Sequence, residues 1–172
     1  YYLHHDFSGE RSVYGCIYVD PSCYEGGQAL LLHGHNMKNG SMFGGLKRYL
    51  NEDYRKAHET IYYQTEDEID TYHVCAIFTG MTTDLELMSS LVPYTDVEFQ
   101  TLKKKITESG TVTEDFARDD RLLLLSTCYG TSTKQRLIVV AKCVQSEAIS
   151  GNQKNTAEAE DQSIPTDATI KE

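Results

Sequence analysis

The 172-residue sequence predicts a mostly β domain with a few helices, an α+β fold whose strands form a closed or nearly closed barrel. About seven or eight short runs of β-branched, aromatic and leucine residues are separated by turn-forming residues. Two or three other segments have apolar residues at helical spacing. Strands and helices do not alternate regularly, which argues against a parallel sheet of βαβ units.

The strand segments are defined by β-forming residues between turn signals. VYGCIYVD, residues 13–20, is rich in β-formers, and the acidic turn 66–68 joins two such runs into a hairpin. In chain order, the predicted strands are residues 1–7, 13–20, 28–33, 60–65, 69–79, 122–128 and 137–141.

One or two short helices are predicted over residues 41–58, with a break near Asn51. The residues expected on their apolar face are Met42, Leu46 and Tyr49. This spacing is typical of a helix that packs on a core.

A longer helix is predicted over residues 95–109, because Thr95 and Glu98 have the spacing of a capping box. Its apolar face is expected to hold Phe99, Leu102 and Ile106. The segments on either side are predicted to be irregular: residues 80–93, whose length suggests a functional loop, and residues 110–120, a polar loop.

Composition divides the chain into a domain, residues 1–145, and an acidic, polar tail, residues 146–172, that we expect to be disordered. The formal net charge of −10 argues against a nucleic-acid partner, since phosphate binding needs a basic surface. The sequence shows no signal peptide and no apolar run long enough to span a bilayer.

The five cysteines form no CxxC pair and no zinc-ligand spacing, so we expect neither a disulfide framework nor a metal site. Cys23 lies in a turn and is expected to be accessible. The cysteines in apolar runs, expected to be buried, are Cys16, Cys75 and Cys143.

The fifth cysteine, Cys128, ends an apolar run of four leucines, and Arg136 begins the next apolar run after a polar loop. Two such runs predict neighbouring antiparallel strands, with both residues at one rim of the sheet. A positive charge beside a thiol lowers its pKa and favours a nucleophile, and an arginine can stabilise an oxyanion. The alternative is that Cys128 is a buried core thiol.

A third candidate, His35, follows the predicted strand 28–33 and lies in a loop flanked by glycine and an Asn-Gly turn signal. The end of a strand is a position from which a histidine can act as acid or base. The alternative is a solvated loop side chain.

Three stretches of the sequence, YYLHHDF, GHNMKNGSMFG and LSTC, resemble in order and separation the class B sortases, cysteine transpeptidases of the Gram-positive cell surface. The resemblance covers residues 1–143 and implies a sortase-type eight-stranded β-barrel with flanking short helices. It implies Cys128 as the nucleophile, His35 as the acid and base, and Arg136 as the residue that steadies the oxyanion. It requires no metal or cofactor.

The resemblance also suggests which residues bind substrate. Ser126 and Thr127, just before the cysteine, are expected to line the pocket for the sorting motif, and Thr82 and Leu87 fall in a loop that covers the peptide in relatives. Tyr129 stands where some relatives have an acidic residue, which leaves the preferred motif open.

The expected reaction is cleavage of an NPQTN- or LPXTG-like C-terminal sorting motif after threonine, followed by transfer of a surface protein to an amine. The acceptor is a peptidoglycan cross-bridge amine or, alternatively, a pilin lysine. The expected location is the outer face of the membrane, reached through an N-terminal anchor not contained in this sequence. A non-catalytic β-barrel binding module and a plain cysteine hydrolase are the competing hypotheses.

Overall fold

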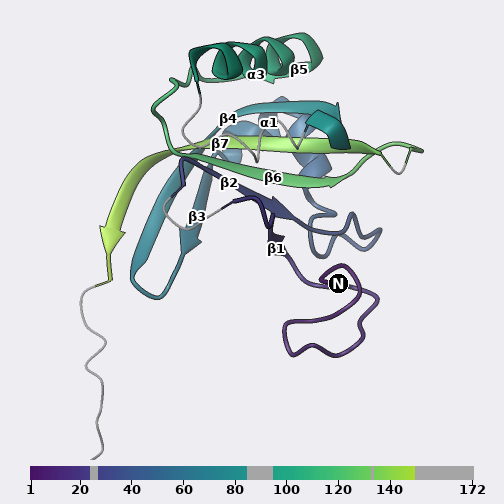
Figure 1. The fold of residues 1–172 in the computed structure, drawn as a ribbon. Coiled ribbons are helices and arrows are strands. Elements are labelled where there is room, and N and C mark those ends of the chain that lie inside the picture. The colour runs from purple at the N-terminus through teal and green to yellow at the C-terminus, as the bar shows by residue number, and fades with distance from the viewer. Residues whose placement is uncertain (24–26, 85–94, 133, 150–172) are drawn as a thin grey trace, which may run out of the picture.

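The computed structural model describes residues 1–23, 27–84, 95–132 and 134–149. In these ranges seven strands form one sheet in the order β1-β2-β6-β7-β4-β3, and β5 pairs with β4 (Figure 1). The strands are β1 (Tyr18–Val19), β2 (Ala29–His33), β3 (Thr60–Gln64), β4 (Glu68–Met81), β5 (Gly110–Val112), β6 (Leu122–Cys128) and β7 (Gln135–Ala148). The helices are the short 3-10 helix η1 (Leu46–Leu50), α1 (Glu52–Ala57) and α3 (Asp96–Ser109).

The predicted mostly β fold with flanking helices is confirmed, but the described sheet is not closed. Its strand order begins at β1 and ends at β3, and no ladder joins these two strands within the described ranges. The strands described number seven rather than the expected eight. Two register irregularities between β4 and β7, at Thr71/Tyr72 and Val74/Ala76, are of the kind that bend strands.

The core lies on both faces of β6, which explains its unbroken run of leucines. Leu122 and Leu124 join the cluster that contains the buried face of α3, whereas Leu123 and Leu125 join the cluster around η1. Neighbouring residues of a strand point to opposite faces, so a strand covered on both sides needs apolar residues at every position. Figure 1 shows α3 lying over one side of the sheet.

The helix predicted over residues 95–109 is confirmed, but the helices predicted over residues 41–58 are confirmed only in part, because the first begins at Leu46 and Met42, with a φ of 51°, lies outside it. Asn51 ends η1 and caps α1, since its side chain accepts a hydrogen bond from the backbone N–H of Tyr54. At the start of α3, Thr95 and Glu98 form the predicted reciprocal capping box. The three residues predicted for its apolar face are the buried ones, Phe99, Leu102 and Ile106.

The strands predicted at the N-terminus are wrong in extent. Residues 1–7 contribute a single bridge, His5 to Arg11, and only Tyr18–Val19 of the run 13–20 is strand. Gly15 explains the interruption, because it has a positive φ of 58° and packs against the backbone of Leu3. Propensity favoured a strand, but this contact imposes a turn.

Two other boundaries differ from the prediction. The loop predicted over residues 110–120 begins with the short strand β5, which pairs with β4. The last strand, predicted over residues 137–141, runs from Gln135 to Ala148, because β4 remains its partner as far as Glu68. Within the described ranges, no helix is long and apolar enough to cross a membrane.

Two adjacent glycines after β2 provide a matched test of packing. A Cβ at Gly44 would overlap the carbonyl oxygen of Met37, whereas at Gly45 the nearest atom would be the Gly40 carbonyl oxygen at 3.9 Å. We expect Gly44→Ala to lower the free energy of unfolding by about 1–3 kcal/mol, measured by urea denaturation. Gly45→Ala should change it by no more than about 1 kcal/mol. Equal effects would contradict the described loop.

Candidate active site

The parallel pair of β2 and β6 sets the position of the site. In its register His33 lies opposite Ser126, and Gly34 N–H extends the ladder by donating to the Ser126 carbonyl at 3.2 Å. His35 follows directly, and Cys128 is the last residue of β6. The segments that carry His35 and Cys128 therefore leave the sheet at the same rim.

Two side-chain hydrogen bonds join the segment after β2 to the end of β6. The Thr127 hydroxyl donates to the Gly34 carbonyl at 2.8 Å and is buried. The Asn36 amide donates to the Cys128 carbonyl at 2.8 Å. Gly34 and Asn36, the neighbours of His35, are therefore hydrogen-bonded to Thr127 and Cys128.

The predicted neighbourhood of Cys128 and Arg136 is confirmed, because the two residues are direct partners in the antiparallel pair of β6 and β7. Directly opposite residues have Cβ atoms about 4.5–5.5 Å apart. Cys128 is exposed and Arg136 is half-buried. The alternative that Cys128 is a buried core thiol is therefore wrong.

The imidazole of His35 is half-buried and held by the N-terminal segment. Its Nε2 lies 2.8 Å from the Leu3 carbonyl oxygen. A carbonyl only accepts hydrogen bonds, so this contact places a proton on Nε2. Nδ1 is then the ring nitrogen left to exchange a proton with a reacting group.

Tyr18 lies near Cys128 and Arg136, and no pattern in the sequence pointed to it. It pairs with His33 across β1 and β2, and the two rings are 5.2 Å apart. Burial raises the pKa of the Tyr18 phenol, nearby Asp20 adds to the rise, and Arg136 opposes it. The phenol is therefore a neutral wall of the site at physiological pH.

The structure describes three of the four predicted substrate-binding residues. The side chains of Ser126 and Thr127 are buried, and within the described ranges the Ser126 hydroxyl has no hydrogen-bond partner. Thr82 lies just after β4, where its N–H donates to the Lys134 carbonyl at 2.9 Å, next to the start of β7. Leu87 lies outside the described residues.

Asn36 was also missed as a residue of the site. The only available signal was its place beside His35 in the GHN sequence, which gives no indication that its amide reaches Cys128 across 92 positions of sequence. Together the groups at this rim comprise an exposed thiol, an imidazole with one nitrogen fixed, and a guanidinium. A nucleophile, a proton carrier and a positive charge are the groups that acyl transfer needs.

A half-buried hydrogen bond between His33 and Asp20 supports the strand that leads to His35. Asp20 accepts from His33 Nε2 at 2.8 Å and from Ser22 N–H at 2.9 Å. Burial alone would raise the pKa of the Asp20 carboxyl, but the hydrogen bonds from Ser22 and His33 outweigh it and hold the pKa below its ordinary value.

The depressed pKa has a consequence for acid stability. A carboxyl whose pKa is lower in the folded state stabilises the fold above its unfolded pKa and loses this effect as the pH falls. We expect Asp20→Asn to reduce the loss of unfolding free energy between about pH 5 and pH 3, by roughly 0.5 kcal/mol for this partly exposed pair. Urea denaturation at the two pH values measures it, with exposed Asp53→Asn as control. Identical pH dependence in wild type and Asp20→Asn would contradict the assignment.

Comparison with known proteins identifies the family with which this chain shares its sequence. A family model of the sortase domain matches residues 5–144. Sortase B of Listeria monocytogenes is 31% identical over 153 residues, and sortase B of Staphylococcus aureus is 25% identical over 151. Each match covers 84% of this chain but only 60% and 61% of the relatives. The chain therefore spans about three fifths of the length of these two proteins.

Solved structures of sortase B proteins match the fold of this chain. Sortase B of Clostridium perfringens has a TM-score of 0.72 at 29% identity, with 84% of this chain and 81% of that chain covered. Sortase B of Bacillus anthracis in complex with AAEK2 has a TM-score of 0.70 at 31% identity, covering 84% and 67%. Fold, order of motifs and rim geometry lead to one conclusion: this chain belongs to the sortase family, and the relatives named here are its class B members.

Proposed function

We propose that this chain is the catalytic domain of a class B sortase, a cysteine transpeptidase. The observation that supports it most directly is the register of three strands, which gathers Cys128, His35 and Arg136 at one rim. The exposure of Cys128 favours this activity over a non-catalytic binding barrel, because an inert core thiol has no reason to lie at the surface.

In the proposed first step, the Cys128 thiolate attacks the threonine carbonyl of a sorting motif. A C–S bond forms, and the carbonyl electron pair moves to oxygen, where the Arg136 guanidinium stabilises the negative charge. As the tetrahedral intermediate collapses, the C–N bond breaks and protonated His35 gives a proton to the departing amine. The product is a thioester on Cys128.

The second step reverses these roles. An acceptor amine attacks the thioester, His35 removes its proton, and the C–S bond breaks to return the Cys128 thiolate. The bond between Nε2 and the Leu3 carbonyl holds the ring in one orientation, so that Nδ1 carries the proton in both steps. Transfer to an amine rather than to water separates this reaction from that of a plain cysteine hydrolase.

The proposed substrates are surface proteins with an NPQTN- or LPXTG-like C-terminal motif. Ser126, Thr127, Thr82 and Leu87 remain the proposed motif contacts. We propose a peptidoglycan cross-bridge amine as acceptor, with a pilin lysine as the alternative, and action at the outer face of the membrane of a Gram-positive cell. The relatives that support this location are sortase B proteins of such bacteria.

The central test is cleavage of a quenched NPQTN peptide, with and without triglycine. We expect wild type to release the leaving group and form a triglycine adduct, and Cys128→Ala to lose at least about a thousandfold in rate. Cys143→Ala, a half-buried thiol far along β7, serves as control. Product without any adduct would favour a hydrolase. Cleavage by Cys128→Ala at the wild-type rate would exclude the proposed nucleophile.

Asn36 provides a second test, of positioning. Asn36→Ala removes the bond to the Cys128 carbonyl, and we expect kcat/KM to fall about tenfold, the effect of one hydrogen bond worth about 1–1.5 kcal/mol. Because Asn36 is exposed, the free energy of unfolding should change by less than about 1 kcal/mol. Exposed Lys38→Ala is the matched control. Unchanged kcat/KM in Asn36→Ala would show that this bond does not position the thiol.

A further inference from the structure

Asp84, three residues past the end of β4, is a buried carboxylate with both oxygens bonded. Its residue is 8% exposed. Oδ1 accepts from the ammonium of Lys105 on α3, and Oδ2 accepts from the backbone N–H of Met81, the last residue of β4, at 2.7 Å. A charge is stable in a protein interior only when it is paired and hydrogen-bonded. The Asp84 side chain therefore joins the end of β4 to α3.

Both sides of this junction are built to hold it. Gly80 leaves the space that the carboxylate occupies, because a Cβ at this position would lie only 3.0 Å from Asp84 Oδ2, closer than an ordinary van der Waals contact. On the other side, the buried face of α3 fixes the helix that carries Lys105 against the core. The strand end is thus bonded to a helix that packing already holds in place.

The bonded strand end lies opposite the start of β7, where Arg136 is found. Met81 pairs with Gln135, and Gly80 pairs with Arg136. The Gln135 carbonyl accepts from Arg136 Nη1 at 3.1 Å and from the N–H of Tyr129, the residue after the candidate nucleophile, at 3.0 Å. The partner of Met81 therefore holds the guanidinium and the end of β6 together.

We propose that Asp84 and Lys105 are positioning residues for Arg136, an inference that rests on the proposed function. The ion pair fixes Met81, the ladder passes that position to Gln135, and the Gln135 carbonyl orients the guanidinium. Both residues act through the backbone of β4 and β7 rather than on the substrate. A donor stabilises an oxyanion only when it is already in place, so a loosened strand end lowers the rate of acyl transfer.

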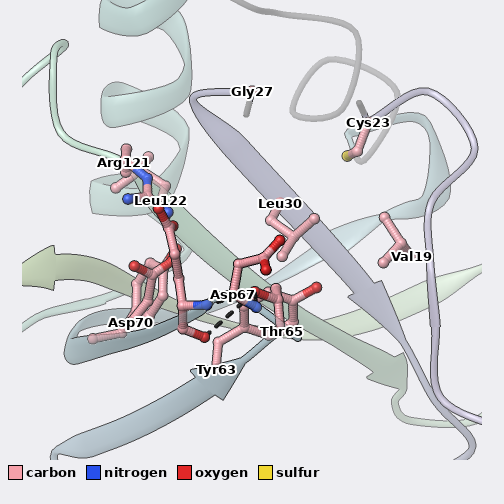
Figure 2. Close-up of a pocket in the computed structure, with 12 residues that line it drawn as sticks. Val19, Cys23, Gly27, Leu30, Tyr63, Thr65, Asp67, Asp70, Arg121 and Leu122 are labelled. Carbon is pink, nitrogen blue, oxygen red and sulfur yellow. Dashed lines mark hydrogen bonds and ion pairs between the residues drawn. The ribbon is translucent and has the colours of Figure 1, made fainter. Parts of the chain in front are cut away.

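A second ion pair of the same kind provides a matched control. Asp70 accepts from the Arg121 guanidinium beside a cavity of about 700 Å³ (Figure 2). The side chains of this pair are 5% and 44% exposed, against 10% and 40% for Asp84 and Lys105. Arg121 immediately precedes β6, whereas Arg136 lies opposite its last residue, about 20 Å along the strand.

Steady-state cleavage of the quenched NPQTN peptide by the full 172-residue chain, with triglycine present, tests the positioning role. Lys105→Gln removes the ion pair, and we expect kcat to fall about tenfold while KM stays within about twofold. This split is expected because an oxyanion donor acts in the transition state. Lys105→Arg keeps the charge and should retain at least about half of the wild-type kcat.

Three further variants separate positioning from stability. Arg121→Gln should lower the free energy of unfolding, measured with urea, but keep kcat within about twofold of wild type. Lys104→Gln, which removes an exposed pair with Glu108 on the same helix, should change neither quantity. Asp84→Asn/Lys105→Gln leaves no unpaired buried charge, so it keeps the test valid if Lys105→Gln does not fold.

A double-mutant cycle shows whether the pair acts through Arg136. In an Arg136→Ala background, we expect Lys105→Gln to cause no further loss of kcat. The rate at which iodoacetamide alkylates Cys128, followed by mass spectrometry, gives the same cycle without a sorting peptide, because a guanidinium beside a thiol favours the reactive thiolate. Lys105→Gln should slow alkylation about threefold in the wild-type background and leave it unchanged in Arg136→Ala.

Several results would overturn the proposal. These are a kcat of Lys105→Gln within about twofold of wild type, an equal loss of kcat in Arg121→Gln, or the same fractional loss with and without Arg136. A loss of unfolding free energy alone would show that the pair only stabilises the fold. A wild-type chain that cleaves no peptide would contradict the proposed function instead, and the alkylation cycle would still decide whether the pair positions Arg136.

Discussion

The parallel pairing of β2 with β6 is the constraint on which the site depends. It joins Ala29 to Leu122 and His33 to Ser126, segments about ninety positions apart, at a substantial cost in loop-closure entropy. That cost is offset by burying β6 on both faces. Without this ladder, Cys128 and Arg136 would still meet through their hairpin, but His35 would have no fixed place beside them.

Beyond the last ladder bond, side chains continue the alignment. Thr127 bonds to Gly34, and Asn36 bonds to the Cys128 carbonyl, so the two chain ends stay aligned where the strands diverge. The leucines behind Cys128 are close-packed, which makes the end of β6 a rigid support for a reactive side chain. The buried core therefore fixes the strand register, and the register brings the site residues together at the rim of the sheet.

Features of the fold that depend on local chemistry could be predicted from sequence. The capping box of α3, the break at Asn51 and the Cys128–Arg136 pair all follow from residues near one another in the chain. The pairing of β2 with β6 could not, because two leucine runs without alternation fit many registers equally well. The prediction of N-terminal strands was wrong for a related reason, because the tertiary contact of Gly15 overrides the β-propensity of its neighbours.

The Asp70–Arg121 pair at the far end of the sheet is difficult to explain by stability. The carboxylate is buried whereas the guanidinium is 44% exposed, and a buried charge in an ion pair typically stabilises a fold no better than apolar residues of similar volume. Within the described ranges, Asp70 Oδ1 has no hydrogen-bond partner either. The strands also leave a hollow where a closed barrel would have a ladder. Packing alone would favour filling the hollow and removing the charge. The pair and the hollow lie at the end of β6 away from Cys128, so the geometry of the candidate active site requires neither of them.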